Sequence, residues 1–177
     1  IGHSARDTFE ILNLLEINME PKSFAVGVRV EHPQEMINIS QYGKDAPDCL
    51  PAAAYKLTAK TEAGRGVYTF FMCPGGYVVN ASSEEKRLAV NGMSYSGRDG
   101  QNANSAVIVT VDPKDFPKPG VLGGLALQRQ LEEAAYKEGN GKIPVQLFAD
   151  FKKNIPSTDA GAIEPQMKGA YSWGNVR

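Results

Sequence analysis

Residues 66–95 carry the clearest signal of architecture: Gly-Val-Tyr-Thr-Phe-Phe-Met-Cys-Pro-Gly-Gly-Tyr-Val-Val-Asn-Ala-Ser-Ser-Glu-Glu-Lys-Arg-Leu-Ala-Val-Asn-Gly-Met-Ser-Tyr. Aromatic and β-branched residues dominate 67–73 and 77–81, and such residues favour strands. Between these runs Pro74-Gly75-Gly76 predicts a reversal, because proline presets φ and glycine tolerates positive φ. A polar turn at 82–86 leads to a third strand, 87–91, which runs into the turn signal Asn91-Gly92. The run therefore predicts a three-stranded antiparallel meander.

Further strands are predicted on both sides of the meander. Phe24, Val26, Val28 and Val30 alternate with smaller or polar residues, which indicates a half-buried strand. Shorter strands are expected at 55–59 and 106–111. With the meander these segments give about six strands.

Two longer segments have the apolar spacing of amphipathic helices, 5–16 and 122–138, and Gly139 and Gly141 follow the second as helix stops. A helical turn is expected at 33–39, and 144–153 fits either a short helix or a strand. The predicted class is α+β: an antiparallel or mixed sheet of about six strands that can curl into a barrel, flanked by two helices.

Composition limits the classes of function. The chain has 177 residues, 42% of them hydrophobic and 22% charged, with a formal net charge of −1. A length of this order suits one domain, and near-neutral charge gives no reason to expect nucleic acid or a membrane surface as partner. Two cysteines, Cys49 and Cys73, are too few for a disulfide framework, so a reducing cytoplasm is the expected location. The chain opens on Ile-Gly, within apparent structure, so we expect it to be part of a longer protein.

Few residues suggest chemistry on their own. The two histidines, His3 and His32, lack spaced ligand partners, so no metal site is expected. Cys73 precedes a turn without a cation or a second cysteine beside it, which favours a small buried residue over a reactive thiol. Glu84 and Glu85 are expected to be solvated in an exposed turn.

Two polar segments are candidate binding elements. Residues 2–7, Gly-His-Ser-Ala-Arg-Asp, crowd a helix start that Ser4 can cap with Asp7 in a capping box, and free backbone N–H groups there favour an anionic ligand. The alternative is a plain capped helix. The second segment, 94–105, is a predicted polar loop with Arg98, Asn102 and Asn104, and an ordinary solvated loop is its alternative.

Five motifs stand out along the chain: Ile-Gly-His-Ser-Ala-Arg-Asp-Thr-Phe (1–9), Phe-Ala-Val-Gly-Val-Arg-Val-Glu-His-Pro (24–33), Met-Cys-Pro-Gly-Gly-Tyr-Val-Val (72–79), Val-Asn-Gly-Met-Ser-Tyr (90–95) and Arg-Asp-Gly-Gln-Asn-Ala-Asn-Ser-Ala (98–106). In this order they resemble motifs of a family of uncharacterised FAD-dependent dehydrogenases (NAD(FAD)-utilizing dehydrogenases), similar to two-domain flavoproteins with an insert in the FAD-binding fold. The resemblance covers the chain to about Gly161.

The resemblance implies a domain organisation and a function. Residues 1–20 would be the strand end and helix that leave the FAD-binding domain, 21–154 the insert domain, and 155–177 a linker or return segment. The insert would be the cap domain of an oxidoreductase, covering the flavin and shaping the substrate pocket. Its partners would be the FAD-binding domain of the same chain and a small-molecule substrate. The alternative is a self-contained β-rich binding domain with no redox role.

FAD is expected in the intact protein but not in this chain alone, because the sequence lacks the Gly-x-Gly-x-x-Gly dinucleotide fingerprint. We expect the helix start, the 73–76 turn and the 98–104 loop to converge on the face that meets the flavin. The catalytic residues are not identified. The candidate cofactor-binding residues are His3, Ser4, Arg6, Cys73, Gly75, Gly76, Arg98, Asn102 and Asn104.

Overall fold

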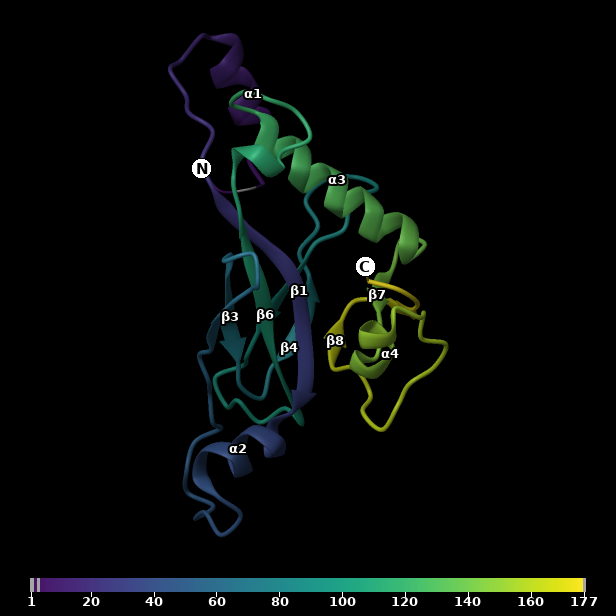
Figure 1. Ribbon diagram of the computed structural model, residues 1–177. Helices are drawn as coiled ribbons and strands as arrows, with labels where there is room; N and C mark the ends of the chain where they lie inside the picture. The colour runs from purple at the N-terminus through teal and green to yellow at the C-terminus, as the bar shows by residue number, and fades with distance from the viewer. Residues whose placement is uncertain (1, 3, 177) are drawn as a thin grey trace.

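The computed structural model describes Gly2 and residues 4–176, and an open four-stranded antiparallel sheet runs through its length (Figure 1). The strand order is β1-β6-β3-β2, so the long strands β1 and β6 pair along their whole length and β3 pairs with the other edge of β6. The strands are β1 (Phe24–Pro33), β6 (Asn102–Val111), β3 (Gly66–Cys73) and β2 (Thr58–Lys60). The alternating apolar residues therefore predicted β1 correctly.

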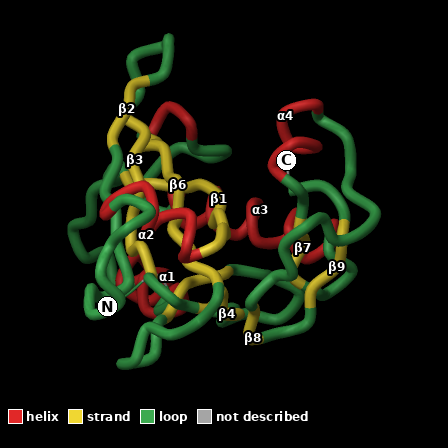
Figure 2. The backbone as a smooth tube through the Cα atoms, turned by 90° about the horizontal axis from the view of Figure 1, so that it is seen from below, coloured by secondary structure: helices red, strands yellow, loops and turns green. Residues whose placement is uncertain are grey.

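Two smaller sheets flank the long one. In the first, β4 pairs antiparallel with β5 and parallel with β8; in the second, β7 pairs parallel with β9. β4 and β8 lie between the large sheet and the C-terminal part that contains β7, β9 and α4 (Figure 2). The strands are β4 (Tyr77–Asn80), β5 (Val90–Met93), β8 (Met167–Lys168), β7 (Ile143–Val145) and β9 (Tyr171–Trp173).

Four α-helices and a short 3-10 helix complete the fold of the described residues. Both longer predicted helices are present, although α1 is shorter than the expected 5–16; Ile11 in it and Leu15 just after it are exposed. Gly139 follows the end of α3, as predicted. The helices are α1 (Arg6–Leu14), α2 (Gln34–Tyr42), α3 (Gly123–Glu138), α4 (Phe148–Lys153) and η1 (Pro113–Asp115). The α+β class is confirmed.

The predicted meander is wrong in its pairing. β3 lies between β2 and β6, so Pro74-Gly75-Gly76 carries the chain from one sheet to another and does not close a hairpin. β4 and β5 do form an antiparallel pair, but Asn91 and Gly92 lie inside β5, opposite Val79 and Val78, and make no turn. An Asn-Gly pair signals a turn only where the backbone has no strand to pair with, and here β4 supplies one.

Three further expectations were wrong. Residues 102–105 belong to β6 and not to a polar loop, because they pair with the end of β1. α1 starts after Ala5 without a side-chain cap, and Asp7 accepts a hydrogen bond from the amide of Thr8 and makes no capping box. The segment after Ile155, expected to be linker or surface loop, contributes β8 and β9.

The polar face of β1 is covered, which the alternation did not indicate. Glu31 Oε1 accepts hydrogen bonds from the amide of Gln166, 2.6 Å away, and from Nδ2 of Asn102, 2.8 Å away. Burial raises the pKa of the Glu31 carboxyl, and these two hydrogen bonds oppose the rise. The second sheet and the C-terminal segment therefore pack against a strand face that looked solvent-exposed in the sequence.

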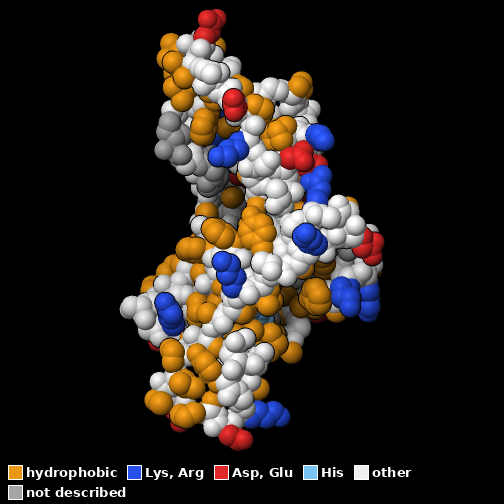
Figure 3. Space-filling model, turned by 60° about the vertical axis from the view of Figure 1, so that its left-hand side comes forward, with side chains coloured by type: hydrophobic (Ala, Val, Ile, Leu, Met, Phe, Trp, Pro, Cys, Tyr) orange, Lys and Arg blue, Asp and Glu red, His pale blue; other side chains and the backbone are white. Residues whose placement is uncertain are grey.

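The interior is small and partly polar, while many large apolar side chains are exposed. The buried apolar residues are Ile37, Ala53, Cys73, Val78, Leu88, Ala103, Val111 and Ile143, and the buried polar ones are Arg6, Gln34, Asn102, Asn104, Ser105 and Ser157. Apolar side chains are spread widely over the face drawn in Figure 3. No helix among the described residues has both the length and the apolar character needed to cross a bilayer.

Candidate functional site

The turn after β3 and the loop after β5 pack backbone against backbone. The amide of Gly100 donates to the carbonyl of Gly75 at 3.1 Å, and Ser94 Oγ donates to the carbonyl of Pro74 at 2.7 Å. A Cβ on Gly75 would lie 2.0 Å from the carbonyl oxygen of Arg98, so only glycine permits this approach. The predicted convergence of the two segments is confirmed, although they meet across two sheets and not at one end of a meander.

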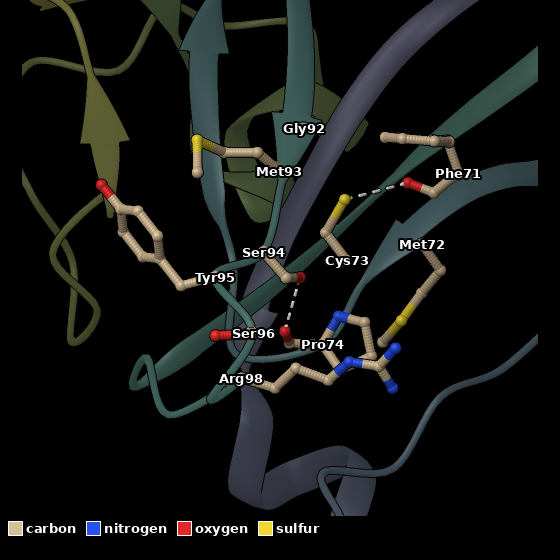
Figure 4. A pocket seen from close by; sticks show the side chains of 10 residues that line it. All are labelled: Phe71, Met72, Cys73, Pro74, Gly92, Met93, Ser94, Tyr95, Ser96 and Arg98. Carbon is tan, nitrogen blue, oxygen red and sulfur yellow. Dashed lines mark hydrogen bonds between the residues drawn. The ribbon is translucent and has the colours of Figure 1, made fainter.

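An open hollow of about 410 Å³ lies where these segments meet (Figure 4). Arg98 extends under Pro74 toward Met72, while Phe71 and Tyr95 stand on opposite sides of the view. More than half of each of these two aromatic side chains is exposed. The lining residues are Phe71, Met72, Cys73, Pro74, Gly92, Met93, Ser94, Tyr95, Ser96 and Arg98.

Arg29 of β1 lies directly behind this lining. Its Nη1 donates to Oδ1 of Asn104 at 2.5 Å and to the carbonyl of Phe71 at 3.2 Å. Its Nη2 donates to Oδ1 of Asn91 at 3.3 Å. A Cβ on Gly92 would lie 2.2 Å from Nη1, so this glycine makes room for the guanidinium. Burial lowers the pKa of Arg29, although an arginine of this kind stays charged.

Cys73 is buried at the edge of the hollow, as expected from the sequence. Its Sγ donates to the carbonyl of Phe71 at 3.4 Å. Burial raises the pKa of the thiol, and the nearby charge of Arg29 opposes the rise. The sequence showed no cation beside Cys73, because Arg29 comes from a strand far away in the chain. The thiol is neutral at physiological pH and acts here as a packing residue.

Two residues of the hollow have unusual backbone conformations. Phe71 has a φ of 49° and Arg98 a φ of 50°, the left-handed region that bulky residues seldom adopt. Phe71 lies where the register of β3 against β6 shifts, between Phe70 and Cys73. Such strain persists only where the surroundings hold it, and it concentrates at functional sites. The two positive φ angles, at Phe71 and Arg98, therefore both lie at the hollow.

The two asparagines predicted as ligand contacts are buried in β6. Asn102 Nδ2 donates to Glu31 and to the carbonyl of Glu164, so this side chain fastens the C-terminal segment to the sheet. Asn104 accepts from Arg29, and its Nδ2 is buried with no partner among the described residues. The side chain of Asn102 thus serves to hold the fold together, whereas Asn104 lies behind the hollow.

The helix start does not join this site. His3 lies outside the described residues, and Ser4 is exposed next to α1. The guanidinium of Arg6 is 1% exposed and pairs with Glu84 and with Glu132, whose Oε1 is 2.5 Å from Nη2. The geometry therefore places Arg6 in an ion-pair cluster and away from the hollow.

Glu84, expected to be solvated, is the centre of this cluster. Besides Arg6 it binds Nη2 of Arg129 at 2.9 Å and Nη1 of Arg87 at 3.0 Å. Hydrogen bonds from Arg129 and Arg6 lower the pKa of the Glu84 carboxyl to about 2. The sequence could not indicate this, because Arg6 and Arg129 come from α1 and α3. Glu85, its neighbour, is exposed as expected.

His32 of β1 and Tyr55, which precedes β2, form a further polar pair: the Nε2 of His32 and the hydroxyl oxygen of Tyr55 are 2.8 Å apart. Burial lowers the pKa of His32, and its Nδ1 is buried without a partner in the described part of the chain. Within that part, no group of three or more His, Cys, Asp or Glu side chains is placed to hold a metal ion.

Comparison with known proteins gives two findings. Residues 23–177 match the family model described as FAD-dependent protein, C-terminal domain-like. A protein of Clostridium beijerinckii, strain ATCC 51743 / NCIMB 8052, bearing the name "Uncharacterized protein", is 50% identical over 181 residues. That alignment covers 100% of this chain and 34% of the relative, so the chain spans about a third of the relative's length.

Proposed function

Because this chain belongs to the family described as FAD-dependent protein, C-terminal domain-like, we propose that it is the cap domain of an FAD-dependent oxidoreductase, a dehydrogenase. In this role it covers the flavin and shapes the substrate pocket. The chain acts as one part of a longer, cytoplasmic protein whose FAD-binding domain is its partner. A small molecule is the substrate.

The exposed aromatic rim of the hollow carries this proposal. Phe71 and Tyr95, which line the hollow, each expose more than half of their side chain, although aromatic residues normally bury most of their area. Exposed apolar surface of this kind marks a place where another surface or a ligand binds. A second domain resting on this rim would cover the rings and close the hollow at once.

The donors around the hollow fit one edge of a flavin. Its rim offers flat apolar surface, and its lining offers the guanidinium of Arg98 and the hydroxyl of Ser96 as donors. A flat ring with a polar edge needs this combination of apolar faces and hydrogen-bond donors. FAD supplies the hydride or electron transfer when it is bound. The nucleotide half needs a glycine-rich strand-to-helix turn, which this sequence does not contain, so the partner domain would hold it.

The residues of this chain bind and orient the ligand, and they exclude water from the site. Cys73 and Arg98 line the hollow, and Gly75 and Gly76 form the adjoining turn, so these four of the expected contacts stay in the proposal. The neutral Cys73 thiol packs, and Arg98 attracts a negatively charged or carbonyl oxygen. Closing the aromatic rim would remove water from the reaction site and strengthen each polar contact in it.

Flavin content of the full-length gene product that contains this chain tests the proposal. We expect the purified protein to show flavin absorbance, and Tyr95→Ala to lower both the flavin-to-protein ratio and turnover with an artificial electron acceptor. Phe148→Ala is the matched control, because this exposed aromatic lies on α4, away from the hollow. A colourless full-length protein would support the alternative, a β-rich binding domain without redox role. Equal flavin content in wild type and both variants would contradict the placement of the flavin.

A further inference from the structure

Two arginines at the hollow differ from the other arginines of the described chain. Within residues 4–176 four arginines form ion pairs with carboxylates, and two do not. The paired ones are Arg6, Arg65, Arg87 and Arg129, and the two without a carboxylate partner are Arg29 and Arg98. Arg98 lines the hollow, and Arg29 contacts its lining at Phe71 and behind Gly92. The unpaired positive charge of the described arginines is therefore concentrated at one place.

Arg29 shows why this concentration needs a counter-charge. Its three oxygen partners, on Asn104, Phe71 and Asn91, are all neutral and use only part of the guanidinium's donor capacity. The nearby Cys73 thiol is also neutral, since burial raises its pKa. A half-buried charge without an opposite charge is unfavourable, and proteins usually supply a partner or a ligand.

Asn104 adds an independent observation. The side chain is fully buried, yet its Nδ2 has no acceptor among the described residues. Its Oδ1 is held by Arg29, and a Cβ on Gly92 would lie 2.3 Å from that oxygen. An unsatisfied buried donor is rare in native proteins and calls for a functional or solvent explanation. Here it adds positive potential behind the same wall of the hollow.

We propose that the hollow binds an oxyanion, a carboxylate or a phosphate group, between the guanidinium of Arg98 at its mouth and that of Arg29 behind Gly92. Guanidinium groups favour such oxygens because their donors match the geometry of carboxylate and phosphate. The anion site itself rests on these contacts, whereas its ligand being the substrate of a flavin enzyme rests on the proposed function. A carboxylate and a phosphate group of a substrate share this chemistry, and the experiment separates them.

The test titrates the 177-residue chain with malonate and with pyrophosphate at constant ionic strength, with chloride as the blank. Amide chemical shifts report the binding place, and we expect the changes to centre on 73–76 and 92–100. Arg98→Gln and Arg29→Gln should each weaken binding at least about tenfold, because each removes a charge-assisted contact. Arg98 is exposed, so its variant stays informative even if Arg29→Gln fails to fold.

Arg65→Gln is the matched control, because this exposed arginine already pairs with Asp115 and lies away from the hollow. It should leave binding unchanged. Tighter malonate binding assigns the site to a substrate carboxylate, and tighter pyrophosphate binding assigns it to a substrate phosphate group. The inference would be overturned if Arg29→Gln and Arg98→Gln showed the same chemical-shift changes as the wild type. It would also be overturned if neither anion caused changes larger than those of the chloride blank. A colourless full-length protein that still binds either anion through both arginines would refute the proposed function alone.

Discussion

Replacing Glu84 by glutamine tests the ion-pair cluster between α1, the 81–89 connection and α3. The substitution preserves shape but removes the charge that binds Arg6 and Arg129. Both arginines keep a carboxylate, on Glu132 and Glu10 respectively, so no buried charge is left alone. We therefore expect a cost below the 3–5 kcal/mol, roughly, that follows when a buried pair loses its only partner.

The pKa of Glu84 gives the size of the effect. A fall from the ordinary value of 4.5 to about 2 corresponds to at most about 3.4 kcal/mol of folding free energy at neutral pH, by proton linkage. The side chain is 22% exposed, and water and salt screen its ion pairs, so we expect about 2 kcal/mol. The expected loss is a sizeable part of the stability of a domain.

The dependence on pH identifies the cause. A carboxyl with a lowered pKa stabilises the fold above its ordinary value, and this stabilisation is lost as the pH falls toward the lowered one. The difference between wild type and Glu84→Gln should therefore be full at pH 7 and shrink between about pH 4.5 and about pH 2. The other carboxyls of the cluster titrate in both proteins and cancel in the comparison to first order.

Urea unfolding followed by circular dichroism, at pH 7 and at about pH 3.5, measures this difference. Glu85→Gln is the control, since this neighbouring side chain is exposed and should change stability by no more than about 0.5 kcal/mol. The reasoning would be refuted if both variants had equal stability at pH 7. It would fail equally if the loss in Glu84→Gln were as large at pH 3.5 as at pH 7.

Two further predictions concern the hollow and the thiols. Gly92→Ala should destabilise the chain by about 1–3 kcal/mol in urea unfolding, because its Cβ would lie 2.2 Å from Nη1 of Arg29; Gly97→Ala, whose nearest contact is 3.4 Å, should be nearly neutral, and equal losses would contradict this. The exposed Cys49 should react with a thiol reagent in the folded chain, whereas the buried Cys73 should react only after unfolding. Equal rates for both thiols would disprove the assignment of Cys73 as a packing residue.

Local periodicity predicted the elements better than their pairing. β1 was predicted because its valines alternate, and α3 because its apolar residues recur at helical spacing and Gly139 follows. The partner of β3 was not predictable in this way, because β6 begins about thirty residues after β3 ends. Turn residues such as Asn91-Gly92 indicate only that the backbone can turn there. Whether a turn forms depends on whether a neighbouring strand is available for pairing.

The candidate site was only partly predictable, because its residues also come from distant parts of the chain. The convergence of the 73–76 turn with the 98–104 loop was predicted correctly, but from a meander whose strands do not pair as expected. Nothing in the sequence indicated that Arg29 would reach Cys73, or that Glu84 would bind Arg6 and Arg129, because these partners are brought together only by the complete fold. A charged residue between the valines of a strand, as at Arg29, is the signal that could have drawn attention to it.

The hydrogen bond from the Gln166 amide to Glu31 also bears on the order in which the chain folds during synthesis. These residues are 135 positions apart, and the carbonyl of Gln166 also accepts from the amide of Val78. During synthesis β4 therefore has one edge without its final partner until residues near 167 have emerged. Folds closed by such distant contacts form slowly, since the loop entropy is lost before the contacts are gained. Until then the free edge of β4 is open to pairing with other nascent chains, which makes this strand the point where misassembly would begin.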